Sequence, residues 1–241
     1  TAQAPGAIYN NKFAGTFGDI GGYSLNCHKH INTGEGGILV TNNDIYAKRL
    51  RLIRNHAEAV VDETVNNKTP NMLGHNFRLG EIECAIGLEQ IKKLKSKVKR
   101  RQQIARILTK ELTKLKGIKT PTIEDNSTHS FYIYAIQVDE ELLGVSKRKI
   151  FEALQAEGIE NILDQYFNLH LLPMYKNKLA YGTKGFPWSS NICKRDIKYG
   201  EGTCPVAEKL NKENLILLEL CVHEYSKKEV ELVVKCFKKV W

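Results

Sequence analysis

The spacing of apolar residues along the chain alternates between that of a strand and that of a helix, which predicts alternating strands and helices. Two short apolar runs, 22–27 and 37–41, are typical of strands joined through the glycine-rich turn TGEGG, and both strands are expected to be buried. The spacing over 44–54 indicates a helix whose N-cap is Asn42 or Asn43.

A polar stretch and two chain breakers divide the next part of the chain. Residues 57–75 are rich in Asn, Val and Thr, which predicts a long exposed loop. Helical spacing begins at 79, runs to 94 and continues to 115, after which Gly117 and Pro121 break the pattern. The break predicts two domains, 1–116 and 117–241.

The second half alternates again between strand and helix periods. A strand, a helix stopped by Gly158 and a return strand are expected at 131–138, 146–157 and 159–163. Residues 168–203 are loop-like and contain Tyr, Trp, Gly and Pro. Three closing elements are expected at 205–210, 215–218 and 226–240, the last of them an amphipathic helix.

The formal net charge of the 241 residues is +9, and one segment carries most of it. The run KKLKSKVKRR at 92–101 holds seven cations and no acid. It lacks interleaved aromatic residues that could stack on bases, so nucleic acid is not an expected partner. The cations are instead expected on the solvated face of a long helix, whose apolar positions are Ile91, Leu94, Val98, Ala105, Leu108, Leu112 and Leu115.

Composition and cysteine spacing exclude several classes of protein. With 42% hydrophobic and 26% charged residues the chain can bury a globular core. Its longest apolar stretch, 215–222, contains Glu219 and is too short to span a membrane. The first residues show no features of a signal peptide, and the six cysteines are scattered without a CxxC pair, which predicts reduced thiols in a cytoplasm.

Lys29 is the candidate for chemistry that the local pattern singles out. It ends an apolar strand and precedes the glycines of TGEGG, where a pocket could desolvate the amine and free it for Schiff-base formation. A surface lysine is the alternative. His28 and His30 flank it but face opposite ways on a strand, so no metal site is expected.

Four ordered blocks around Lys29 resemble the DegT/DnrJ/EryC1/StrS family of pyridoxal-phosphate-dependent sugar aminotransferases. They are AQAPGA (2–7), AGTFGDIGGYSLNCHKHINTGEGGILVTN (14–42), RLRLIRNHAEAVV (49–61) and LGHNFRLGEIECAIGLEQIKKL (73–94). The likeness continues through HSFYIYAIQV, LQAEGI, LHLLPMY and CPVAEKL. The resemblance therefore covers nearly the whole chain.

The resemblance implies an α/β fold, the fold type I of pyridoxal-phosphate-dependent transferases. Residues 1–116 would be the end of its three-layer large domain with a long exit helix, and 117–241 its small α/β domain. Lys29 matches the lysine that binds the cofactor aldehyde and then moves the proton. A branch of the family that dehydrates its sugar has histidine there, so Lys29 favours transamination.

The resemblance also implies four further cofactor contacts. Gln3 matches a glutamine that lies against the cofactor ring, and Ser24 matches a serine that hydrogen-bonds the phosphate. Asn26, on the same strand face as Ser24, is a further candidate for the phosphate contact. Asn76 matches an asparagine that reaches a neighbouring subunit's phosphate, which implies a homodimer. The alternatives are a surface glutamine for Gln3 and an ordinary helix cap for Asn76.

Three residues match segments that border the sugar site. His56 lies in the segment RNH, and His170 and Tyr175 lie in LHLLPMY. The alternatives are a helix C-terminus compensated by cations for RNH, a hydrogen-bonded histidine for His170 and a half-buried tyrosine for Tyr175.

The implied activity is transfer of an amino group from glutamate or glutamine to a keto group of a nucleotide-linked sugar or a cyclitol, as in polysaccharide biosynthesis. The family's acidic partner of the cofactor's pyridinium nitrogen would fall one position before Thr1, and the preceding half of the large domain would lie further upstream. We therefore expect the isolated chain to bind cofactor poorly. A truncated, inactive family member that acts as a scaffold or regulator is the alternative.

Overall fold

The structure is a computed structural model that describes residues 1–58 and 72–241, and the chain divides into two compact units. Unit 1 comprises 1–106, 122–132 and 220–224, and unit 2 comprises 107–121, 133–219 and 225–241. The predicted loop 57–75 lies mostly outside the described residues. The domain boundary at 116/117 stays a prediction.

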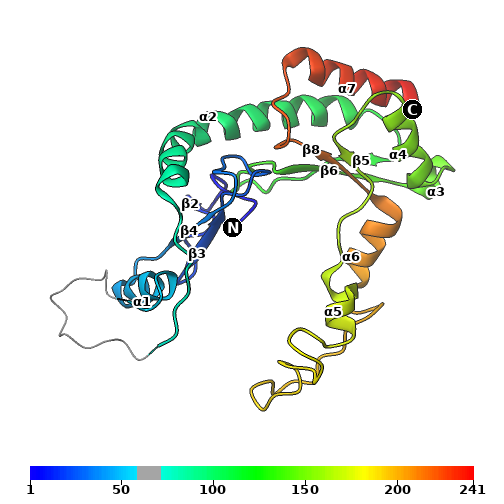
Figure 1. Cartoon of the computed structure of the whole chain (residues 1–241). Helices are drawn as coiled ribbons and strands as arrows, with labels where there is room; N and C mark the ends of the chain where they lie inside the picture. Colours follow the sequence, from blue (N-terminus) through cyan, green and yellow to red (C-terminus); the bar gives the residue numbers. More distant parts are fainter. Residues whose placement is uncertain (59–71) are drawn as a thin grey trace. The chain divides into compact units, whose positions relative to one another are not determined.

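The described residues of unit 1 form two β-hairpins and two helices (Figure 1). Strands β1 and β2 pair antiparallel, and β3 and β4 pair antiparallel with Ser24 opposite Gly37. Asn43 caps α1, because its side-chain oxygen accepts from the N–H groups of Ile45 and Tyr46. The elements are β1 (Ile8–Tyr9), β2 (Lys12–Phe13), β3 (Gly21–Ser24), β4 (Gly37–Val40), α1 (Asp44–Arg54) and α2 (Glu81–Leu112), the last continuing into unit 2 beyond Arg106.

The strand β4 is exposed, so the prediction that both strands of the hairpin are buried is wrong for β4. Ile38 is 37% exposed and Leu39 58% exposed. The physical reason is that the apolar side chains of β4 line an open hollow and are not covered by a packed layer in the described part of the chain.

The basic run lies on α2, but it does not lie wholly on a solvated face. Arg101 is only 4% exposed, and its Nε donates to the carbonyl of Leu220 at 3.0 Å. Lys97 pairs with Glu224. The expectation of a solvated face is therefore wrong for Arg101, because a spacing of three from Val98 and four to Ala105 puts it on the buried stripe. Ile91, expected on that stripe, is 52% exposed.

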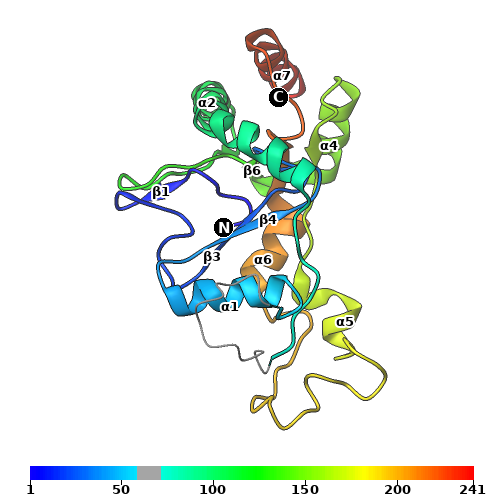
Figure 2. The same cartoon turned by 60° about the vertical axis from the view of Figure 1, so that its left-hand side comes forward.

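Unit 2 is a four-stranded antiparallel sheet in the order β5-β6-β8-β7. Helix α4 packs against α7 and against β7 and β8 (Figure 2). The strands are β5 (Ile118–Lys119), β6 (Ile133–Val138), β7 (Ile162–Leu163) and β8 (Leu215–Glu219). The helices are α3 (Glu140–Leu143), α4 (Lys147–Ala156), α5 (Pro173–Lys176), α6 (Pro205–Lys209) and α7 (Lys227–Val240), with a 3-10 turn at Leu169–Leu171 and a π turn at Leu210–Asn214.

The core of unit 2 follows from the alternation along β6. Tyr134, Ile136 and Val138 are each at most 1% exposed, and they alternate with half-buried neighbours. The Tyr134 hydroxyl and the Thr109 hydroxyl share a hydrogen bond of 2.7 Å, which satisfies the one polar atom of that buried ring. Phe237 of α7 is fully buried. The predicted strand 131–138 and the predicted helix 226–240 are thus confirmed apart from their ends.

No helix in the described ranges is both long enough and apolar enough to cross a membrane.

The capping box that starts α7 gives the first testable prediction. Ser226 accepts from the N–H of Glu229, whose carboxylate accepts in return from the N–H of Ser226. We expect Ser226→Ala to lower the free energy of unfolding by about 1 kcal/mol, because a helix N–H loses its partner. Urea denaturation followed by circular dichroism measures it. Ser96→Ala, at an exposed interior position of α2, is the control and should not destabilise.

Candidate active site

The residues after β3 fold into a tight turn that presents Lys29. Ser24 Oγ accepts from the Asn26 N–H at 3.2 Å, and Asn26 Oδ1 accepts from the His28 N–H at 3.1 Å. The Lys29 N–H donates to the Asn26 carbonyl at 2.9 Å. Asn26 also donates to Glu35 Oε1 at 2.7 Å, which ties the turn to the TGEGG loop. Serine and asparagine close such turns through their own side chains, so the local sequence dictates this geometry.

Lys29 is half-buried rather than exposed. Its Nζ lies 4.4 Å from the centroid of the Tyr132 ring, a cation–π contact. No carboxylate forms an ion pair with Lys29 among the described residues. An amine held without a carboxylate counter-ion is suited to react with a carbonyl group.

His30, the next residue, is buried and anchors the turn. Its Nε2 lies 2.8 Å from the carbonyl oxygen of Ser130. Because a carbonyl only accepts, Nε2 carries the proton and donates. Burial is the main cause that lowers the pKa of His30 to about 4, and the charges of Arg101, His129 and Lys29 add to it. His30 is therefore a neutral imidazole at neutral pH.

Two buried polar atoms beside this hydrogen bond are unsatisfied. Within the described part of the chain, neither His30 Nδ1 nor Ser130 Oγ finds a partner. Such atoms are costly to bury, so the packing around them must be stabilised elsewhere. The consequence is a site whose stability depends strongly on the one bond that His30 does make.

The segment that carries Tyr132 is itself tightly held. The Phe131 N–H donates to His129 Nδ1 at 2.8 Å, and the two rings lie 4.4 Å apart. Phe131 has a φ of +53°, a conformation that a non-glycine residue adopts only when its surroundings impose it. Burial lowers the pKa of His129. These contacts fix the direction in which Tyr132 leaves the segment.

Neither His30 nor Tyr132 is predicted as a site residue from the sequence. The sequence raises His30 only as a possible metal ligand, and Tyr132 lies about one hundred positions away in the block HSFYIYAIQV. The only signal is the order of the blocks, which implies no pairing between them. The contact between Lys29 and Tyr132 emerges only in the three-dimensional structure.

Three other predicted site residues of unit 1 are exposed. Gln3 is an exposed turn residue. Asn76 is exposed and forms an isolated bridge with Asn55. The alternative that Asn76 caps a helix is wrong, because α2 begins only at Glu81. His56 is exposed with a φ of +57°, and its N–H donates to the His75 carbonyl at 3.0 Å.

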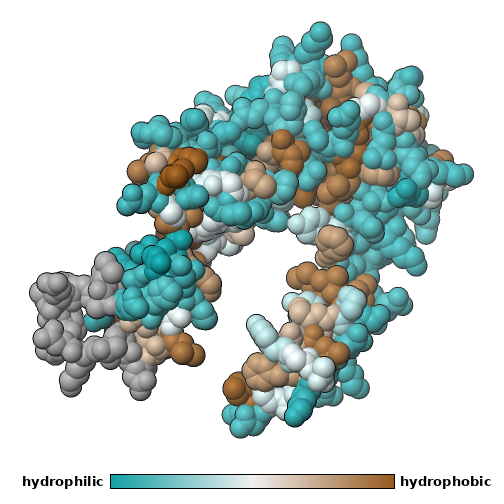
Figure 3. Space-filling view, viewed as in Figure 1, coloured by the Kyte–Doolittle hydropathy of each residue, from teal (hydrophilic) through white to brown (hydrophobic). Residues whose placement is uncertain are grey.

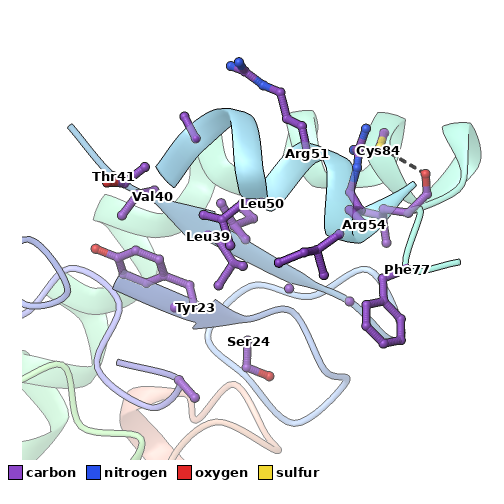
Figure 4. Close-up of a pocket in the computed structure, with 18 residues that line it drawn as sticks. Tyr23, Ser24, Leu39, Val40, Thr41, Leu50, Arg51, Arg54, Phe77 and Cys84 are labelled. Atoms are coloured by element: carbon purple, nitrogen blue, oxygen red, sulfur yellow. Dashed lines mark hydrogen bonds between the residues drawn. The ribbon is translucent and has the colours of Figure 1, made fainter. Parts of the chain in front are cut away.

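A hollow of about 1040 Å³ lies beside the β3–β4 hairpin (Figure 4). Ser24 and Tyr23 of β3, Leu39 of β4 and Leu50 of α1 line it, and Phe77 closes one side. Lys29 is not among its lining residues. The hollow is mainly the uncovered apolar side of β4, and Ser24 is the predicted cofactor residue that it shares with the Lys29 turn.

The other two predicted substrate residues belong to unit 2. His170 donates from Nε2 to Glu208 Oε1 at 2.7 Å and is only 11% exposed in its side chain. Glu208 also accepts from the N–H groups of Gly202 and Cys204, and these bonds lower its pKa. Tyr175 packs against the rings of Trp188 and Tyr199, which also contact each other. Their predicted contact with a sugar stays a prediction.

Among the described residues no group of three or more His, Cys, Asp or Glu side chains could hold a metal ion.

Known proteins that are similar to this chain identify its fold and its family. The chain superposes on the structure of DesV from S. venezuelae with a TM-score of 0.77 at 22% identity, over 99% of this chain and 56% of that one. The fold is therefore the type I fold of pyridoxal-phosphate-dependent aminotransferases. The profile of the DegT/DnrJ/EryC1/StrS aminotransferase family matches residues 1–216, and the chain belongs to that family.

Two curated relatives have sequences similar to this chain. The spore coat polysaccharide biosynthesis protein SpsC of Bacillus subtilis is 28% identical, over 81% of this chain and 52% of that protein. The UDP-4-amino-4,6-dideoxy-N-acetyl-beta-L-altrosamine transaminase of Campylobacter jejuni is 32% identical, over 66% of this chain and 41% of that enzyme. The chain thus spans about half the length of the curated relatives it matches.

The buried imidazole of His30 gives a prediction on pH and stability. Its folded pKa of about 4 lies below the reference value of 6.5, so the unfolded chain binds the proton more readily. Stability is therefore fully present above pH 6.5 and falls as the pH drops toward 4. We expect His30 to account for a loss of about 3 kcal/mol between pH 7 and pH 4.

Urea denaturation at a series of pH values isolates this contribution. The difference in unfolding free energy between the wild-type chain and His30→Gln should change by about 3 kcal/mol between pH 7 and pH 4. His28→Gln, at the exposed neighbouring position, should keep the wild-type dependence. Equal slopes for the wild-type chain and His30→Gln would contradict the assignment.

Proposed function

We propose that this chain carries the lysine-bearing part of an aminotransferase that aminates a keto group of a nucleotide-linked sugar or a cyclitol. Glutamate or glutamine is the proposed amino donor, and pyridoxal 5'-phosphate the proposed cofactor. The observation that carries the proposal is the half-buried Lys29 amine, presented by a tight turn and paired with no carboxylate in the described chain.

The residues around Lys29 fit that cofactor in two respects. The amine matches an aldehyde chemically, and the Ser24 hydroxyl lies at the start of the same turn, where it is available to a phosphate. The charges of Lys29 and Arg101 both lower the pKa of His30, so two cations lie near the turn, and they would attract an anion. Pyridoxal phosphate supplies an aldehyde and an electron-withdrawing ring when it is bound.

Each predicted cofactor residue of the chain would have its own role. Lys29 would hold the cofactor and, once displaced, move a proton at its Nζ. Ser24 would bind the phosphate, with Gln3 and Asn26 as further contacts. In the structure Asn26 Oδ1 accepts from the His28 N–H within the turn, and Asn26 Nδ2 donates to Glu35 of the TGEGG loop. Asn26 therefore supports the proposal mainly by shaping the turn.

The substrate class rests on the relatives. One is named a UDP-amino-sugar transaminase, and others from Caulobacter vibrioides and Vibrio cholerae are named GDP-perosamine synthases. We propose the same broad class here, with His56, His170 and Tyr175 as the residues nearest the sugar. We also propose a reducing cytoplasm as the location, because all six cysteines are free thiols.

We propose that two copies of the chain associate, with Asn76 reaching the partner's phosphate. An apolar surface at the start of α2 supports this proposal, and Figure 3 shows apolar atoms over these first turns. Ile82 and Ile86 are 75% and 42% exposed and share one helix face. Leu73 and Phe77, just before the helix, are 87% and 66% exposed. Such a cluster is typical of an interface.

Lys29→Arg tests the proposed chemistry in the complete polypeptide. The protein is incubated with pyridoxal phosphate, reduced with borohydride and digested, and the labelled peptide is identified by mass spectrometry. We expect the label on Lys29 in the wild-type protein and its loss in Lys29→Arg, since a guanidinium does not condense with the aldehyde.

Lys93→Arg, at an exposed position of α2, is the matched control and should leave the labelling unchanged. An unlabelled Lys29 in the complete wild-type protein would overturn the proposal. A stable oligomer that takes up no label would favour the scaffold alternative instead.

Ile82→Asp tests the proposed association. A charge placed in an apolar interface must be desolvated, so we expect the dissociation constant of the dimer to rise about tenfold or more. Analytical ultracentrifugation measures it. Leu232→Asp, at an apolar position of α7 that is 47% exposed, should leave it unchanged. A dimer that resists Ile82→Asp would refute this interface.

A further inference from the structure

Tyr132 is the residue that faces the reactive amine, although no comparison assigns it a role. The Lys29 Nζ lies 4.4 Å from the centroid of its ring, well within the range of a cation–π contact. We propose that Tyr132 is a positioning residue, whose ring face holds the Lys29 ammonium group while that amine is free of the cofactor. The inference rests on the proposed function of Lys29.

The contact between Lys29 and Tyr132 is fixed from both sides. On one side, His30 follows Lys29 directly and donates to the Ser130 carbonyl at 2.8 Å in the interior. On the other side, Ser130 stands two positions before Tyr132, and the intervening Phe131 is locked by its bond to His129 Nδ1. The two segments that bear the amine and the ring are therefore joined by a buried bond.

Among the described residues, the partner of the Lys29 amine is a ring face and not a carboxylate. A carboxylate would hold the ammonium group by a full ion pair and would favour its charged form strongly. A ring face attracts the cation more weakly. At a partly exposed site, the contact favours the position over the ring by about two- to five-fold. Lys29 has the ring and, in the described chain, no carboxylate. The amine is thus given a defined place that it can leave at little cost.

The contact with the ring also restricts the direction in which the Lys29 side chain points. Lys29 has four rotatable side-chain bonds, and an unrestrained amine would sample many positions around the turn. The ring limits these positions to one side of the turn, which raises the fraction of time that the amine spends where it can react. Tyr132 would therefore act through Lys29 and would not itself transfer a proton.

Nuclear magnetic resonance of the complete polypeptide, labelled with ¹³C at lysine Cε, tests the contact directly. Protons above a ring face resonate upfield, and Lys29→Arg assigns the Lys29 signal. We expect this signal upfield in the wild-type protein and in Tyr132→Phe, and near the exposed lysine signals in Tyr132→Leu. No cofactor is needed for this measurement.

A fluorinated series separates electrostatics from shape. Phenylalanine with one, two and three ring fluorines, introduced at position 132, keeps the ring's size but weakens its negative face. We expect the upfield shift of Lys29 to fall step by step along the series, while the urea midpoint stays constant. This series also keeps the test valid if Tyr132→Leu fails to fold.

An unchanged Lys29 signal across the whole series would overturn the inference, because a purely structural ring would give that result. The same samples, treated with pyridoxal phosphate and borohydride, separate the two proposals. A labelled Lys29 with no ring shift leaves the proposed function standing and removes the role of Tyr132. A ring shift with no label on Lys29 in the wild-type protein refutes the proposed function, and the positioning role with it.

Discussion

One buried hydrogen bond organises the candidate site: His30 Nε2 donates to the Ser130 carbonyl. It joins two segments separated by about one hundred residues, and it satisfies the N–H of an imidazole whose pKa burial lowers to about 4. The turn that presents Lys29 and the strained segment that presents Tyr132 meet because of this bond. The local sequence therefore specifies the turn that presents Lys29. The tertiary structure specifies where the amine lies relative to Tyr132.

The regular elements can be predicted where local chemistry decides them. Helix α1 is predicted from 44 to 54 and α4 close to its ends, because caps such as Asn43 and Ser146 mark helix starts in the sequence itself. Exposure is predicted less well. An apolar strand is expected to be buried, yet Leu39 remains in solvent because nothing in the described chain covers β4. Burial depends on neighbours that a single segment does not reveal.

The candidate site divides in the same way. Ser24, Asn26 and Lys29 lie within six positions and share one turn, so local sequence and resemblance are enough to group them. Arg101 is predicted wrongly, because a cation within a basic run is ordinarily solvated. Its spacing places it on the buried stripe of α2, and the Leu220 carbonyl accepts from its guanidinium there. Tyr132 lies in one of the blocks that resemble the family, but nothing in the sequence pairs it with Lys29. Residues that act across the fold can be identified only once the fold brings them together.

The carboxylate of Glu208 has a consequence for how this fold diversifies. It accepts from His170 at one end of segment 170–204 and from Gly202 and Cys204 at the other end. A single side chain thus joins the two ends of this segment. Residues between these ends can be inserted, deleted or substituted without changing the strands of unit 2, so new binding specificities can arise in this segment on the same fold.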